Sequence, residues 1–321
     1  MNKDEELISE LVATRAFQRL KRIRFLGAID YLVRAPNGVR GNIRHTRYEH
    51  SLGVARLAQI YSDTRILSNK DRRLIHVAAL LHDIGHAPLS HSLEPTFANI
   101  YGLDHHAVTA KIIRAQWPLG DQVVRVLRKY KVDIEGVISI IVGENDDFDG
   151  FFAGPINFDT IEGVLRSWTY AGQASSPSPK AVVMAAATRE SDGDRKTVDA
   201  FWGCKNEVYV NIINSRVGAM ADAAAQFFMR ENIDKFKADD YLSTEASVFK
   251  KMPGLRQLLA SKNFPREAEA ILPGTFTYKV RKFFVDKSRD FFKRRDKERY
   301  RQSSGKAVLA GAGERGKLEL Q

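Results

Sequence analysis

The histidines of this chain are confined to one short stretch, and this constrains the chain more than any other feature. All eight histidines of the 321 residues lie between His45 and His106. Several stand beside carboxylates, in the runs Arg47-Tyr48-Glu49-His50 and His82-Asp83-Ile84-Gly85-His86, and the second run continues to His91. Imidazole is the commonest side-chain metal ligand and titrates near neutral pH. Packing alone explains such crowding poorly, so the sequence predicts a metal-dependent hydrolase.

The composition is that of a globular protein without a membrane span. Apolar residues make up 44% and charged residues 28% of the chain, which are ordinary values for such proteins. No apolar run approaches the roughly 20 residues needed to cross a bilayer. The charged start Met1–Glu6 lacks an apolar signal core. A single cysteine, Cys204, suits a reducing compartment. We therefore expect a cytoplasmic protein that does not contact membranes.

The hydrophobic pattern predicts an all-α fold. Apolar residues recur at helical spacing along most of the chain, as in residues 6–26. A Ser/Pro-rich segment at 173–180 is the clearest linker. We expect a helical core over residues 1–172, an additional helical region over 181–302, and a disordered tail at 303–321, which is small, polar and charged.

The positive charge of the chain is concentrated near its C-terminus. The net charge is +11, and residues 279–306 hold 12 Lys and Arg against 4 Asp and Glu. This basic segment also carries the pairs Phe283-Phe284 and Phe291-Phe292. We favour an amphipathic helix that packs its phenylalanines on the body. Contact with nucleic acid through charge and stacking is a second interpretation. A basic interface of a homo-oligomer that binds a nucleotide effector is a third.

The pair His82-Asp83 indicates a metal site. The two residues are predicted to stand near the end of a buried helix, where both side chains can reach one ion beside a cavity. Further ligands must come from elsewhere, and His50 and Asp159 are the candidates. Two imidazoles and two carboxylates suit one divalent ion, which could be Mn, Fe, Co, Ni, Zn or Mg. Such an ion lowers the pKa of bound water and screens phosphoryl charge.

These motifs resemble the HD-domain phosphohydrolase superfamily, and most closely its deoxynucleoside triphosphate triphosphohydrolase (dNTPase) branch. The resemblance covers residues 14–170 and rests on the runs Arg47 to Val54, His82 to His86, Pro88 to His91 and Asn157 to Asp159. It implies an HD-domain helical core in which His50, His82, Asp83 and Asp159 hold the metal.

The resemblance also implies residues that contact substrate. Arg47, His86, His91 and His105 would face the substrate phosphates, where a cationic or hydrogen-bonding clamp stabilises developing charge. His91 or His105 would give a proton to the leaving oxygen. Weaker similarity over Lys205 to Asp222 adds Arg216 as a substrate contact.

Four residues depart from the pattern of the dNTPase branch, and one of them is His106, which follows His105 where a glutamate is usual. Gly163 stands where that branch has a tyrosine that packs on the sugar, and Ser167 replaces an aspartate that contacts a sugar hydroxyl. Phe25 replaces a glutamine. The metal ligands are thus retained while the surroundings of the sugar differ.

The predicted function is hydrolysis of a nucleotide, foremost a nucleoside triphosphate, by metal-activated water with release of tripolyphosphate. Two alternatives stay open. The first is a nuclease or phosphodiesterase on single-stranded nucleic acid, which the basic segment 279–306 and the altered sugar surroundings would suit. The second is a catalytically silent HD protein that senses a nucleotide and regulates a partner.

Overall fold

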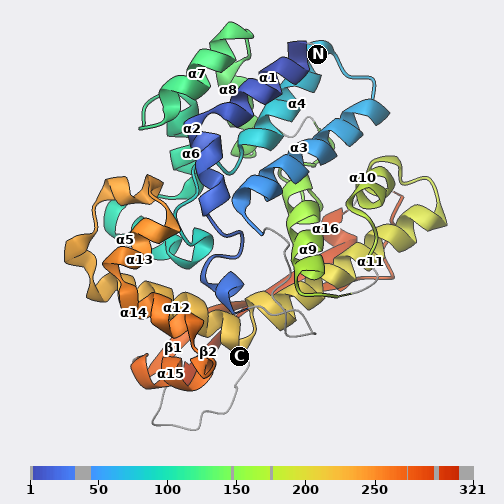
Figure 1. The fold of residues 1–321 in the computed structure, drawn as a ribbon. Coiled ribbons are helices and arrows are strands. Elements are labelled where there is room, and N and C mark those ends of the chain that lie inside the picture. The colour runs from blue at the N-terminus through green and yellow to red at the C-terminus, as the bar shows by residue number, and fades with distance from the viewer. Residues whose placement is uncertain are drawn as a thin grey trace.

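The computed structural model describes residues 3–32, 45–145, 148–173, 176–272, 274–292 and 296–310. The described part is mainly helical, with one two-stranded antiparallel ribbon, so the predicted all-α class is confirmed (Figure 1). The N-terminal elements are α1 (Lys3–Ala13), α2 (Arg15–Arg19), η1 (Leu20–Arg22), η2 (Gly27–Tyr31), α3 (Arg47–Thr64), α4 (Asn69–Leu81), η3 (Ser90–Ser92), α5 (Glu94–Tyr101), α6 (His105–Ile113), α7 (Gly120–Lys129), α8 (Ile134–Ile141) and α9 (Phe158–Tyr170).

The C-terminal elements continue the helical body and end in the ribbon. They are α10 (Pro179–Thr188), α11 (Asp192–Val208), η4 (Tyr209–Ile213), α12 (Arg216–Glu231), η5 (Ile233–Lys235), η6 (Ala238–Leu242), α13 (Glu245–Lys251), α14 (Pro253–Ala260), α15 (Phe264–Ile271), β1 (Thr275–Val285), α16 (Asp296–Arg299) and β2 (Tyr300–Ala310). η4 is a π-helical stretch that directly follows α11.

Helix α4 lies at the centre of the N-terminal part because its second half is almost entirely apolar. Its residues from Val77 to Leu81 are fully buried. The side chain of Ser68 caps its start by accepting a hydrogen bond from the backbone N–H of Asp71. α4 packs against α3 and α8, and α3 also packs against α9. The start of α3, the end of α4 and the start of α9 can therefore contribute side chains to one site.

The C-terminal helices pack directly on the N-terminal core. α10 contacts α3, α9 and α11, and α11 contacts α9 (Figure 1). The linker predicted at 173–180 joins α9 to α10, and its residues 174–175 lie outside the described part of the chain. Helices after the linker contact helices before it, so these contacts do not separate two domains. The division into a core at 1–172 and a second region from 181 stays a prediction.

The basic segment 279–306 is not the amphipathic helix that we predicted. Within it, residues up to Val285 complete β1 and residues from Tyr300 belong to β2, and the two strands pair antiparallel from Thr275↔Ala310 to Val285↔Tyr300. Successive side chains of a strand point to opposite faces. Phe283 is accordingly buried whereas Phe284 is 47% exposed.

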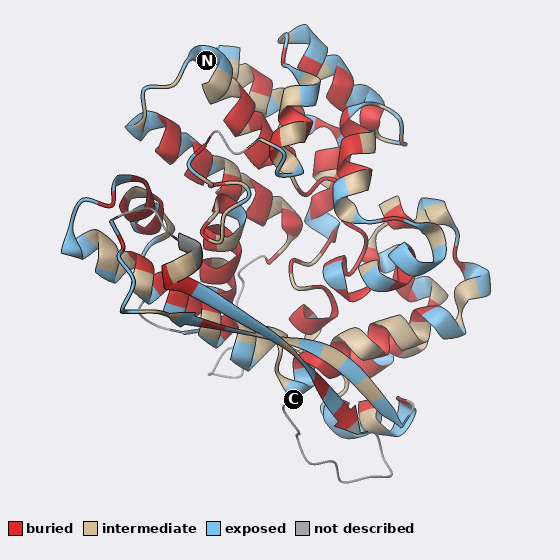
Figure 2. Cartoon of the chain, turned by 180° about the vertical axis from the view of Figure 1, so that it is seen from behind, coloured by how far each residue is buried: buried red, intermediate tan, exposed pale blue. Residues whose placement is uncertain are grey.

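The hairpin is attached to α11 by a cluster of aromatic side chains. Trp202 is fully buried, and its ring centroid lies 5.4 Å from those of Phe283 and Tyr300. The Nζ of Lys205 lies 4.3 Å from the Trp202 ring centroid and 4.6 Å from that of Phe283. In Figure 2 the ribbon crosses the molecule with exposed residues along its outer side.

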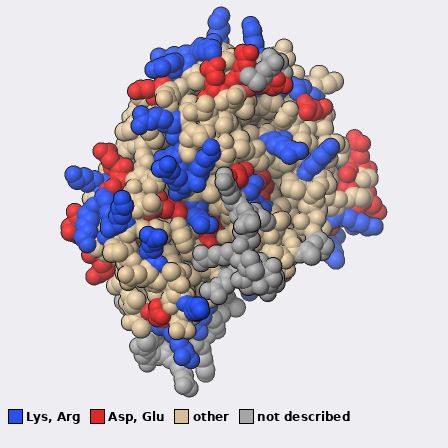
Figure 3. Space-filling view, in the orientation of Figure 1, with Lys and Arg blue, Asp and Glu red and all other residues tan. Residues whose placement is uncertain are grey.

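The tail predicted to be disordered from 303 is partly ordered. Residues up to Ala310 form β2 because each pairs with a residue of β1, and residues 311–321 lie outside the described part. On the face shown in Figure 3, basic and acidic side chains are interspersed. None of the described helices has the length and apolar character required to cross a membrane.

Candidate metal centre

The four predicted metal ligands come from three helix ends that meet in space. His50 stands in the first turn of α3, and His82 and Asp83 follow α4 directly. Asp159 stands in the first turn of α9, whose N-cap is Asn157. The Asn157 side chain accepts the backbone N–H of Thr160 at 2.7 Å. The carboxylate of Asp159 is therefore not used as the cap of its own helix.

The ligand atoms of these residues converge on one point. The Nε2 atoms of His50 and His82 are 3.2 Å apart. The His50 Nε2 lies 3.0 Å from Asp159 Oδ1 and 3.6 Å from Asp83 Oδ2. Asp83 Oδ1 lies 3.4 Å from His82 Nε2. Two ligands at about 2.1 Å from a common ion are about 3 Å apart when they meet it at a right angle. The separations fit a shared ion.

The hydrogen bonds behind the two imidazoles leave these Nε2 atoms as acceptors. His50 Nδ1 lies 2.6 Å from Glu162 Oε2, and His82 Nδ1 lies 2.9 Å from the carbonyl oxygen of Ala79. Each Nδ1 can carry the proton that it donates to such an oxygen, so each Nε2 can present a lone pair to a metal ion that takes the place of a proton there. Two facing lone pairs repel one another, whereas a cation between them is favourable.

The electrostatics of the site also favour a cation. Burial alone would lower the pKa of His50, but hydrogen bonds with Asp159 and Glu162 raise it to about 9. Burial would raise the pKa of Asp83, but the charges of Arg47 and His82 lower it well below its ordinary value. The buried negative charge that holds a proton on His50 can instead be balanced by a metal ion.

Arg47 lies behind the metal ligands and orients Asp83. Its Nη1 donates to Asp83 Oδ2 at 2.7 Å, and its Nε donates to Ser90 Oγ at 3.0 Å. Leu89 and Ser90 both have positive φ, at 58° and 46°, which is an uncommon conformation for residues with a side chain. This turn brings Ser90 to Arg47. Arg47 also lines the cavity, so contact with substrate stays a prediction for it.

The three predicted catalytic histidines form a second cluster next to the metal ligands. The rings of His86 and His105 are stacked with centroids 4.2 Å apart, and His91 lies edge-on to His86 at 4.8 Å. Glu94 accepts from His91 Nδ1 at 2.8 Å and also from His105 Nδ1. Burial would raise the pKa of Glu94, but these two hydrogen bonds lower it strongly. His86 Nε2 is 3.1 Å from Asp83 Oδ1, which joins the two clusters.

Arg216 is not brought to this site. Its guanidinium pairs with Glu269 of α15, and its side chain is 57% exposed. The residues that line the cavity beside the metal ligands do not include it. The expected substrate contact of Arg216 therefore has no counterpart in the described geometry.

The residues that depart from the dNTPase pattern all line the cavity, which has a volume of about 320 Å³. A Cβ placed on Gly163 would lie 2.7 Å from the Cζ of Phe25, so the Phe25 ring fills the space that a side chain at 163 would need. The same ring lies 4.4 Å from that of His50. Ser167 donates to the carbonyl oxygen of Gly163 at 2.7 Å.

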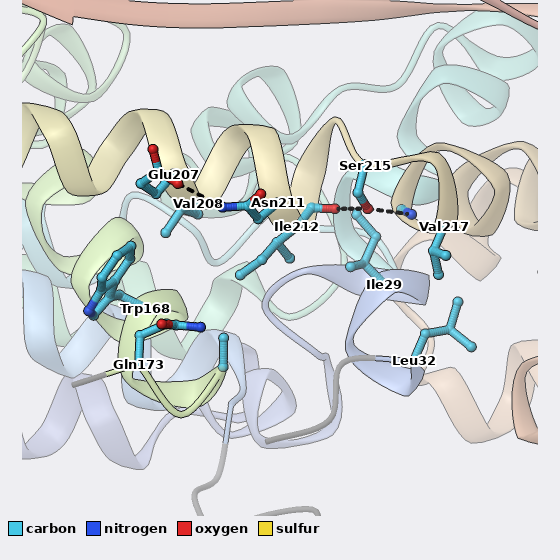
Figure 4. A pocket seen from close by; sticks show the side chains of 12 residues that line it. Ile29, Leu32, Trp168, Gln173, Glu207, Val208, Asn211, Ile212, Ser215 and Val217 are labelled. Atoms are coloured by element: carbon cyan, nitrogen blue, oxygen red, sulfur yellow. Dashed lines mark hydrogen bonds between the residues drawn. The ribbon is translucent and has the colours of Figure 1, made fainter. Parts of the chain in front are cut away.

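A second cavity of about 440 Å³ lies beyond Val208, which lines both cavities. Figure 4 shows its side chains, contributed by the end of α9, by α11 with η4, and by η2. Asn211 Nδ2 donates to Glu207 Oε2 at 2.8 Å there. None of the predicted metal ligands lines this cavity, so it is distinct from the metal centre.

Sequence analysis missed two carboxylates that orient the site. Glu162 holds His50, and Glu94 holds His91 and His105. Both follow a predicted site residue by three positions, Asp159 and His91 respectively. On a helix this spacing places two side chains on one face, and it was the only signal available in the sequence.

Comparison with known proteins indicates the class. Residues 47–156 match the family model of the HD domain. This stretch of the chain is thus similar to the HD domain, which agrees with the resemblance seen in the sequence.

Two curated proteins are similar to about half of this chain. The uncharacterized protein YwfO of Bacillus subtilis is 32% identical over 177 residues, which are 52% of this chain and 37% of YwfO. A deoxynucleoside triphosphate triphosphohydrolase SAMHD1 homolog of Dictyostelium discoideum is 28% identical over 152 residues, 44% of this chain and 27% of that protein. The matches to these two proteins thus span less than half of their lengths.

A solved structure shares the fold over almost the whole chain. The crystal structure of a hypothetical protein from Aquifex aeolicus superposes with a TM-score of 0.67 and 17% sequence identity, and it covers 95% of this chain and 92% of that protein. At this identity the likeness extends to the fold and not to the function.

Proposed function

We propose that the protein is a metal-dependent phosphohydrolase that acts on nucleotides, with a nucleoside triphosphate as its substrate. One observation carries the proposal: the Nε2 atoms of His50 and His82 face each other at 3.2 Å beside the carboxylates of Asp83 and Asp159. An HD domain and a relative named a deoxynucleoside triphosphate triphosphohydrolase support the same reaction class.

The proposed division of work follows the two clusters. His50, His82, Asp83 and Asp159 would hold one divalent ion, which lowers the pKa of bound water and neutralises phosphoryl charge. The metal stays unassigned among Mn, Fe, Co, Ni, Zn and Mg. Arg47 keeps Asp83 in place.

The histidine cluster would handle the proton of the leaving group. Glu94 binds the Nδ1 atoms of His91 and His105, so each ring can present its Nε2 to the cavity that both line. A proton at one of these Nε2 atoms can pass to the leaving oxygen as the phosphoester bond breaks. His86 packs against both rings and limits their movement.

Product analysis tests the proposal. The protein is incubated with Mn²⁺, Co²⁺ or Mg²⁺ and a panel of ribo- and deoxynucleoside triphosphates, and the products are resolved by ion-exchange chromatography. Asp83→Ala should abolish turnover, whereas Asp63→Ala, which removes a carboxylate that is 59% exposed, should not. Nucleoside and tripolyphosphate are the expected products.

Two other results would redirect the assignment. Full activity of Asp83→Ala would contradict the metal site. Tight nucleotide binding with no product in any metal would favour the silent sensor. A cytoplasmic location and a homo-oligomer stay predictions from the sequence.

A further inference from the structure

A large groove adjoins the cavity of the proposed metal centre and is lined by basic side chains without salt-bridge partners among the described residues. The groove lies between α12 and β1 and has a volume of about 580 Å³, larger than the 320 Å³ of the cavity itself. His91, Tyr209 and Ile213 line both spaces, so the two adjoin beside a proposed proton donor.

The basic residues of the groove lack acidic partners. Arg230 of α12 and Lys279 and Arg281 of β1 line it. Within the described part of the chain, none of the three forms a salt bridge. Three unpaired cations lining one groove suit a ligand with several negative charges.

The acidic residue in the lining offsets only part of this charge at neutral pH. Burial raises the pKa of the Asp222 carboxyl to about 7, although a hydrogen bond from Ser92 Oγ at 2.5 Å opposes the rise. Asp222 is therefore largely neutral below that pH.

The same strand also contributes aromatic residues to the lining of the groove. Phe276 and Tyr278 both line the groove, with ring centroids 6.3 Å apart. They are two positions apart on β1 and thus share one face of the strand. A positive groove with successive aromatic rings is the arrangement that binds single-stranded nucleic acid without reading its sequence.

Next to the proposed metal ligands, the space for a bulky group is limited at Gly163. The Phe25 ring occupies the place of a side chain there and is 8% exposed. A substrate that reaches the metal centre therefore has its room for extension at His91, where the groove begins.

We propose that this groove binds the sugar–phosphate backbone of a single-stranded nucleic acid whose scissile phosphodiester lies in the catalytic cavity. The inference rests on the proposed metal-centred hydrolysis and adds a second substrate class to it. Water forms a P–O bond to the phosphorus, and the ester P–O bond breaks. One water proton neutralises the leaving oxygen, by way of His91 or His105, and the other is released from the phosphomonoester product. A duplex would have to be opened first to reach this cavity.

Binding is tested separately from cleavage. A fluorescent 12-residue oligothymidylate is titrated with the full chain in EDTA, and anisotropy gives the affinity at several salt concentrations. Arg230→Gln and Lys279→Gln should each weaken binding and reduce the slope of log K against log [salt] by about 0.7, the value for one phosphate contact of a single strand. Lys282→Gln removes an exposed charge from the same strand outside the groove, and should leave affinity and slope unchanged.

The outcomes separate the two proposals. No oligonucleotide binding, groove variants that bind like the wild type, or an equal effect of Lys282→Gln would overturn the groove. Inorganic tripolyphosphate is titrated in parallel by its competition with the oligonucleotide. If Arg230→Gln and Lys279→Gln weaken tripolyphosphate as much as they weaken the oligonucleotide, the groove holds the phosphates of a mononucleotide and the inference fails. Binding without cleavage after Mn²⁺ is added would instead count against the proposed hydrolysis.

Discussion

Glu162 should set the affinity of the metal centre although it cannot reach the ion itself. Its Oε2 accepts a hydrogen bond from His50 Nδ1 at 2.6 Å, and its side chain is 7% exposed. Such a carboxylate fixes the ring orientation of a ligating histidine and raises its basicity. We therefore expect Glu162→Gln and Glu162→Ala to weaken metal binding while all four proposed ligands remain.

The size of the effect follows from what each substitution keeps. Loss of a carboxylate behind a metal-bound histidine costs roughly 10–100-fold in affinity. Gln can still accept the His50 N–H and loses only the charge, so we expect about 10-fold, or about 1.4 kcal/mol. Ala loses the hydrogen bond as well and also leaves Arg166 without its partner, so we expect close to 100-fold, or about 2.7 kcal/mol.

Isothermal titration with Mn²⁺ measures these affinities directly. Glu135→Gln is the matched control, because Glu135 also pairs with an arginine, Arg114, but is 66% exposed and lies away from the site. Unchanged Mn²⁺ affinity in both Glu162 variants, or the same loss in Glu135→Gln, would refute the role assigned to the His50–Glu162 contact.

Three further predictions concern stability. Burial raises the pKa of Glu245 from 4.5 to about 7; the unfolded chain therefore releases this proton first, and stability should fall by up to about 3 kcal/mol as pH rises from about 4.5 to about 7. Urea unfolding at pH 5 and pH 8 measures this loss of stability, which should be absent in Glu245→Gln. If the variant loses as much stability as the wild type, another group causes the pH dependence. Gly85→Ala should cost about 1–3 kcal/mol, since its Cβ would lie 2.4 Å from the backbone nitrogen of Thr109 in α6; wild-type thermal stability would show that α6 is free to move. Trp202→Ala should cost about 3–5 kcal/mol and expose the hairpin to proteolysis before the helical body, and simultaneous cleavage of both would contradict the attachment described for the ribbon.

The sequence could indicate that His82 and Asp83 lie at one site because their signal is local. His82 and Asp83 are adjacent in sequence, and the end of a buried helix places both beside one cavity, as the structure shows. The carboxylate that orients His50 could not be predicted from the sequence, for a physical reason. Glu162 lies 112 residues from His50, and only the packing of α9 on α3 brings the two together.

The basic hairpin shows where a charge pattern misleads. The many Lys and Arg residues of 279–306 suggested one solvated face of a helix. The strand shows instead in the alternation of half-buried Phe276 and Tyr278 with the exposed residues on either side of them. A long pairing between 275–285 and 300–310 stabilises it, and sequence periodicity alone does not reveal such a partner.

The position of a bound ion is the most direct test of the account. Crystals soaked in Mn²⁺ and measured for anomalous scattering should show a peak within about 2.2 Å of the Nε2 atoms of both His50 and His82, with Asp83 and Asp159 completing the protein ligands. A peak among His86, His91 and His105 instead, or no peak at saturating Mn²⁺, would contradict the proposed metal centre and the hydrolysis built on it.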